Sequence, residues 1–155
     1  MPFITFWAVM EHLVEPRAFL HISAKLLRPG GHCFILVPNL QSLAMRLLGS
    51  KYRYILPEHL NYFEKATLHT FVHKEPAFEM VDSGSTHFNP VVIWQDWRSP
   101  KAFVSDEDRA RLLQRTTAWK QNTILRPMKF VYRVTERLLG ALNLADNLFV
   151  VLRRK

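Results

Sequence analysis

Apolar residues in the first 40 positions have the spacing of a strand, a helix and a second strand. Residues 3–9 form a short uninterrupted apolar run, which predicts a strand buried on both faces of a parallel sheet. Residues 16–27 place apolar side chains at helical intervals after an initial proline. A Pro-Gly-Gly sequence at 29–31 predicts a helix cap and turn, and 32–37 predict a second buried strand. The pattern therefore predicts one right-handed βαβ unit.

The rest of the chain mixes helical periodicity with strand-like alternation, which favours an α/β fold with antiparallel strands after the parallel pair. The further helices are expected at 40–48, 66–73, 105–121 and 127–140, the further strands at 78–88 and 147–153, and ordered connections at 51–63 and 89–104.

Composition is that of a folded chain. Of the 155 residues 48% are hydrophobic, which excludes a disordered polypeptide, and a single cysteine, Cys33, excludes an internal disulfide framework. No apolar stretch reaches the length of a membrane span, and the N-terminus does not resemble a signal peptide. We therefore expect a cytoplasmic location, with peripheral contact to a membrane as an additional expectation from the charge distribution described next.

The positive charge of the chain lies in its C-terminal third. The formal net charge is +8, and residues 101–155 contribute twelve basic against five acidic residues, a net +7. Four of the basic residues fall on one face of the helix predicted at 127–140, namely Arg126, Lys129, Arg133 and Arg137. Two interpretations follow: a solvated helix that covers the sheet edge, or contact of residues 126–139 with an anionic membrane surface or an acidic partner. Nucleic-acid binding is not expected, because no recognised binding module accompanies the charge.

Two acid–histidine pairs follow the two predicted parallel strands. Glu11 and His12 come directly after the first strand, and Glu58 and His59 lie in the loop after the second. Because the carboxyl ends of parallel strands share one edge of a sheet, both pairs are expected at the same edge. A neutral imidazole there can accept a proton, and either group can bind a metal. The alternative is an ordinary carboxylate at a helix start beside a polar histidine.

Several segments in this order resemble one family, the class I S-adenosylmethionine-dependent methyltransferases, and within it the subset with ubiquinone-biosynthesis O-methyltransferases. The resemblance covers residues 3–88 and the last strand, and it rests on Phe6-Trp-Ala-Val-Met-Glu-His-Leu13, Glu15-Pro16, Leu27-Arg-Pro-Gly-Gly31, Val37-Pro-Asn39, Pro57-Glu-His-Leu-Asn-Tyr-Phe63 and Asp146–Leu152.

The resemblance implies a Rossmann-like sheet of seven strands, of which this chain carries the last four. Residues 1–155 would then form a single incomplete methyltransferase-like domain. Its parts would be the family core at 1–88, a connection and basic helical insertion at 89–145, and the terminal strand at 146–155. The first three strands of the family, with the Gly-rich loop and the acidic residue that bind the cofactor, have no counterpart in this sequence.

The resemblance also assigns roles to individual residues. Phe6 and Trp7 are expected to line the S-adenosylmethionine pocket. His12 and His59 are the candidate catalytic bases, and the acceptor side comprises Glu11, Asn39, Glu58 and Tyr62, with Tyr52, Tyr54 and Phe63 shaping the pocket. Some relatives hold a metal with a further acidic residue three positions before the Glu. That position is Ala8 here, so no metal is expected.

Two hypotheses about function follow. The chain is expected to be part of a methyltransferase that acts on an oxygen or nitrogen of a small or lipid-like acceptor, inactive alone because half a cofactor site cannot align the methyl group. The alternative is a non-catalytic half-fold binding protein that uses the basic helix at a membrane surface or partner. In either case the unpaired edge at residues 3–9 predicts pairing with a missing N-terminal half, or dimerisation through that edge.

Overall fold

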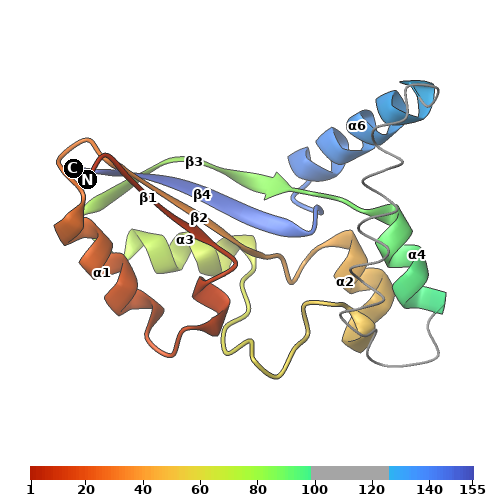
Figure 1. The fold of residues 1–155 in the computed structure, drawn as a ribbon, viewed down its shortest axis with the longest axis horizontal. Helices are drawn as coiled ribbons and strands as arrows, with labels where there is room; N and C mark the ends of the chain where they lie inside the picture. The colour runs from red at the N-terminus through yellow and green to blue at the C-terminus, as the bar shows by residue number, and fades with distance from the viewer. Residues whose placement is uncertain (99–125) are drawn as a thin grey trace.

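The computed structural model describes residues 1–98 and 126–155, which are organised around a four-stranded mixed sheet (Figure 1). Strands β1 and β2 are parallel, whereas β4 is antiparallel to both β2 and β3. The last strand of the chain therefore lies between the second and the third, as the mixed α/β prediction allows. In spatial order the strands are β1 (Phe3–Trp7), β2 (His32–Pro38), β4 (Asn147–Arg154) and β3 (Phe78–Thr86).

Helix α1 (Pro16–Leu26) connects the two parallel strands, as the βαβ prediction requires. The helix ends before the glycines, where the Leu27 N–H donates to the Ser23 carbonyl. Gly30 has φ +76°, and the Gly31 N–H donates to the Arg28 carbonyl at 2.8 Å. The Pro-Gly-Gly sequence therefore forms the turn into β2. The C-cap of α1, predicted within that sequence, is instead Leu27, which precedes the proline.

Helices α1 and α3 (Lys65–His73) lie on one side of the sheet and bury its inner face (Figure 1). Residues of alternating register on all four strands point into this layer, as period-2 alternation requires. The main core comprises Met10, Leu20, Ala24, Leu27, Cys33, Ile35, Val37, Phe63, Leu68, Val72, Phe78, Leu148, Val150 and Leu152.

Strand β1 is not buried on both faces, so the prediction made from its apolar run is wrong. It is an edge strand that pairs only with β2 in the described sheet, and its outward-facing Phe3 and Trp7 are 66% and 57% exposed. The Trp7 ring contacts Phe34 with centroids 5.1 Å apart, and Phe34 stacks on Phe149 at 6.2 Å. A continuous apolar run records hydrophobic side chains on both faces of a strand, but not whether a second layer covers them.

Three helices gather at the end of the molecule away from the two termini (Figure 1): α2 (Leu43–Leu48), α4 (Pro90–Arg98) and α6 (Arg126–Ala141). Helix α4 replaces the first part of the connection expected at 89–104, because Pro90 begins a helix there. The rest of that connection and the helix expected at 105–121 lie outside the described residues. In the part of the chain that the structure describes, no helix has the length and apolarity needed to cross a bilayer.

Candidate functional site

The loops that follow the two parallel strands are joined to each other. After β1 the chain turns at Ala8, with φ +51°, into a short 3-10 turn at Met10–His12. The backbone N–H groups of Leu60 and Asn61 both donate to the Glu11 carbonyl, at 2.8 and 3.0 Å. The segments that carry the two acid–histidine pairs therefore lie at one edge of the sheet, as the sequence predicts.

The Asn61 side chain also joins the two loops, a contact that we call the loop junction. Its Nδ2 donates to the carbonyls of Met10 and Leu13, at 3.2 and 2.6 Å, which span the 3-10 turn. Sequence reasoning passed over this residue, although it lies within the Pro57–Phe63 segment that carries the family resemblance. Asn61 has no titratable side chain, so it is missed when only acidic and histidine residues are considered as site residues.

The junction brings Glu11, His12 and His59 into one cluster. One ligand atom from each lies within 4.8 Å of the others. The two imidazole rings meet edge to face with centroids 4.5 Å apart, and the Nδ1 of His12 lies 3.1 Å from the Glu58 carbonyl oxygen. Both candidate bases are therefore close together. We call Glu11, His12 and His59 the Glu-His-His cluster.

Burial sets the electrostatics of the Glu-His-His cluster. Glu11 is 1% exposed, and neither of its carboxylate oxygens makes a hydrogen bond to another described residue. Burial raises the pKa of Glu11, while its own backbone N–H and the adjacent His12 act in the opposite direction. Burial lowers the pKa of His59, and His12 contributes to that shift. The cluster therefore favours a neutral imidazole beside a carboxylate that lacks a polar partner.

These three side chains fit a divalent cation. One carboxylate and two imidazoles form a donor set that suits zinc, iron(II) and related ions. A buried carboxylate without a hydrogen-bond donor is also costly unless a proton or a cation neutralises it. The expectation of no metal considered only Glu11 and His12 as local ligands, because Ala8 is not acidic; the fold places His59 beside them as a third candidate ligand.

Two tyrosine rings lie against His59. The Tyr54 ring is stacked at 6.5 Å between centroids, and the Tyr62 ring lies at 6.1 Å. Tyr62 is exposed and its hydroxyl donates to the Leu56 carbonyl, while Glu58 is exposed with its carbonyl toward His12. The structure therefore places Glu58 and Tyr62 beside the two histidines, where an acceptor role for them remains a prediction.

Asn39 makes a different set of contacts. It is 1% exposed, its Nδ2 donates to the carbonyls of Asn143 and Ala145, both at 2.9 Å, and its Oδ1 accepts from the Gln41 N–H at 3.0 Å. These bonds tie the end of β2 to the segment that leads into β4. The side chain expected at the acceptor is thus engaged with the backbone.

Phe6 and Trp7 point to opposite faces of the sheet. Phe6 packs against the core beneath the sheet, whereas Trp7 lies on the uncovered face against Phe34. Neighbouring residues of a strand necessarily diverge in this way. The structure does not bring these two side chains, both expected in the cofactor pocket, together on one face.

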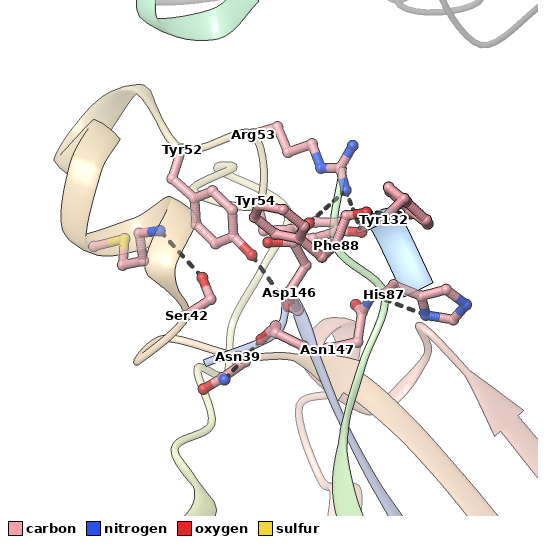
Figure 2. Close-up of polar contacts among 12 residues, drawn as sticks. Asn39, Ser42, Tyr52, Arg53, Tyr54, His87, Phe88, Tyr132, Asp146 and Asn147 are labelled. Carbon is pink, nitrogen blue, oxygen red and sulfur yellow. Dashed lines mark hydrogen bonds and ion pairs between the residues drawn. The ribbon is translucent and has the colours of Figure 1, made fainter. Parts of the chain in front are cut away.

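A second buried polar group lies where β4 begins (Figure 2). The Asp146 side chain is 2% exposed and forms an ion pair with Arg53 at 3.5 Å, while the Tyr52 hydroxyl donates to the Asp146 carbonyl at 3.1 Å. Burial raises the pKa of Asp146 to about 6, against the lowering effect of Arg53. Tyr52, expected to shape the pocket, therefore holds the aromatic loop to β4, together with Arg53.

Comparison with known proteins gives a match over the part that carries the Glu-His-His cluster. Residues 2–75 match a family model described as a methyltransferase domain. Residues 2–75 of this chain are therefore similar to a methyltransferase domain. The match confirms the family resemblance proposed from the motifs. It ends before β3, so the matched residues 2–75, which we call the methyltransferase segment, contain both loops of the cluster.

Two proteins similar to this chain carry related descriptions. A ubiquinone biosynthesis O-methyltransferase of Caulobacter vibrioides is 35% identical over 75 residues, covering 44% of this chain and 30% of that protein. A crystal structure of a SAM-dependent methyltransferase from Archaeoglobus fulgidus aligns with 99% of this chain and 59% of its own, at 17% identity and a TM-score of 0.48. The chain thus spans less than a third of the length of the curated relative.

Proposed function

We propose that this chain supplies the acceptor-facing part of an S-adenosylmethionine-dependent methyltransferase that acts on an oxygen or nitrogen of a small or lipid-like acceptor. The Glu-His-His cluster carries the proposal, because it stands at the carboxyl ends of the parallel strands within the methyltransferase segment. Tyr54 and Tyr62 lie against His59, and aromatic side chains commonly line small-molecule sites.

Either histidine of the cluster suits the role of general base. Methyl transfer to a hydroxyl or amine requires that the acceptor lose a proton, and a neutral imidazole within hydrogen-bond reach can take it. Burial lowers the pKa of His59, which favours its neutral form, and His12 lies against it in edge-to-face contact.

The cluster also supports a divalent cation in place of a histidine base, since a ring nitrogen that binds a cation cannot accept a proton. Glu11, His12 and His59 would hold it, and a bound cation would polarise an acceptor oxygen as a Lewis acid. The buried Glu11 oxygens, which lack hydrogen bonds to other described residues, are the observation that favours this reading over a proton relay alone.

The described residues do not form a cradle for the cofactor. The loop after β1 enters a 3-10 turn, the loop after β2 begins with a turn anchored by Asn39, and neither contains the glycines that let a backbone approach a nucleotide. Phe6 and Trp7 face opposite ways. We therefore propose that a further polypeptide segment completes the S-adenosylmethionine site and that this chain alone is inactive.

Titration calorimetry of this chain with S-adenosylmethionine tests the proposal. We expect no saturable heat, and micromolar affinity would contradict the need for a completing segment. A second observation tests the family role itself: DNA upstream of the Met1 codon, or in a neighbouring gene, should encode a strand followed by a D-x-G-x-G-like loop. Absence of such a segment from both places would remove the support for a methyltransferase.

A further inference from the structure

Helix α6 exposes an apolar stripe along its length. Phe130, Val134 and Leu138 recur every fourth position along α6 and are between 40% and 69% exposed, and Val131 beside them is 62% exposed. Residues at this spacing lie on one side of a helix. Hydrophobic side chains in a row of this kind are normally covered by a core or a partner.

The opposite side of α6 is the one that holds the helix to the sheet. The Tyr132 hydroxyl donates to the Phe88 carbonyl, and the Ser85 hydroxyl donates to the Gly140 carbonyl at 3.2 Å. A Cβ built on Gly140 would lie 2.9 Å from the Ser85 carbonyl oxygen, so helix and strand approach closely there. A helix that merely covers the sheet edge would turn its apolar stripe inward; α6 turns it outward.

Positive charge flanks the exposed stripe. Arg133 and Arg137 are exposed, and neither forms an ion pair within residues 1–98 and 126–155. The C-terminal third as a whole carries a net charge of +7. Helix α4 lies at the same end of the molecule (Figure 1), with Trp94 and Trp97 exposed. Exposed tryptophans and an apolar stripe flanked by arginine are typical of surfaces that meet the headgroup region of a bilayer.

We propose that α6 docks on an anionic lipid bilayer, lying in the interface plane with Phe130, Val134 and Leu138 toward the acyl chains and Arg133 and Arg137 at the headgroups. Charge complementarity favours an anionic bilayer as the partner. Its headgroups would pair with the two arginines, while its acyl chains would cover the apolar side chains. This inference does not depend on the proposed function.

Vesicle flotation of the full chain tests the docking. With vesicles of phosphatidylcholine containing roughly 30 mol % phosphatidylglycerol, the chain should float with the lipid, and raising the salt from about 0.1 M to about 0.5 M should weaken binding several-fold. The affinity of the chain for vesicles of phosphatidylcholine alone should be lower by at least about tenfold. Equal binding to both compositions, or no binding to either, overturns the proposal.

Paired variants separate the two parts of the surface. V134E/L138E should abolish flotation, and R133Q/R137Q should lower affinity for anionic vesicles about tenfold or more. Matched controls are I22E/L26E on α1 for the two new charges and K25Q/R28Q, at the end of α1 and just after it, for the two lost ones; both should float as the parent does. Circular dichroism confirms that each variant is folded. Unchanged flotation of V134E/L138E contradicts the proposal. It is also contradicted if the parent chain does not bind vesicles and light scattering shows a parent dimer that V134E/L138E no longer forms.

Discussion

His12 and His59 meet edge to face with ring centroids 4.5 Å apart and an interplanar angle of 81°, although one follows β1 and the other lies in the loop after β2. The contact depends on backbone bonds between their loops, above all the two N–H groups that share the Glu11 carbonyl. Because the two parallel strands end at the same edge, a short turn and a longer loop can meet there. The site is therefore a junction whose geometry depends on the residues that join the loops.

Asn61→Ala should loosen this junction. The substitution removes two hydrogen bonds, to the carbonyls of Met10 and Leu13, and leaves these groups without a donor, which should lower the free energy of unfolding by about 2 kcal/mol. Urea unfolding measures the change. Gln41→Ala is the control, because it removes an exposed side-chain hydrogen bond to Glu64 and should cost about 0.5 kcal/mol or less. Equal effects of the two substitutions would show that Asn61 is not a special anchor.

Glu11→Gln should separate the carboxylate's role in binding from its role in folding. The charge is buried and lacks a hydrogen bond to another described residue, so its removal should leave the free energy of unfolding unchanged or slightly higher near neutral pH. If the cluster binds a cation, affinity for Co²⁺, followed by its visible absorption, should fall about tenfold or more. Glu15→Gln, four positions further on, is the control and should leave Co²⁺ affinity unchanged. A marked loss of stability in Glu11→Gln would instead point to an internal structural partner.

The sequence was a sound guide to strands, to α1 and α3, and to the pairing of Glu11 and His12 with the loop of His59, because these depend on local periodicity and on the shared edge of parallel strands. It was a poor guide to exposure. The same apolar pattern describes the covered Ile4 and the uncovered Trp7, since coverage depends on a second layer that residue order does not record. The position of His59 beside Glu11 and His12 likewise depends on how the two loops meet, which the spacing within one segment does not record.

Asp146→Asn should change how stability depends on pH. Burial raises the pKa of Asp146 from near 3.8 to about 6, so between these values the folded state holds a proton that the unfolded state has lost. The contribution of this group therefore favours folding at low pH and is lost as the pH rises toward 6, by up to about 3 kcal/mol. Asn at this position keeps an oxygen for Arg53 but carries no charge.

Urea unfolding at about pH 4.5, within that window, and at about pH 7.5, above it, tests this account by comparing the parent chain with Asp146→Asn. The variant should gain stability relative to the parent at the higher pH and lose that advantage at the lower one. Asp82→Asn, on the exposed side of β3, is the control and should show no such pH-dependent difference. If Asp146→Asn were less stable at the higher pH, the ion pair with Arg53 would outweigh the cost of burying the charge.

Gly140→Ala tests whether α6 is seated on β3 as the structure shows. In an isolated helix this substitution would be favourable by about 1 kcal/mol, because glycine is the poorer helix former. Here the new Cβ would lie 2.9 Å from the Ser85 carbonyl oxygen, a backbone atom that cannot move without shifting β3. The helix must therefore move away from the strand, which weakens the Ser85 and Tyr132 hydrogen bonds, and we expect a net loss of about 1–2 kcal/mol in the free energy of unfolding. Val131→Ala on the exposed side should be neutral or slightly stabilising. A more stable Gly140→Ala would show that helix propensity, unopposed by contact with β3, governs this position.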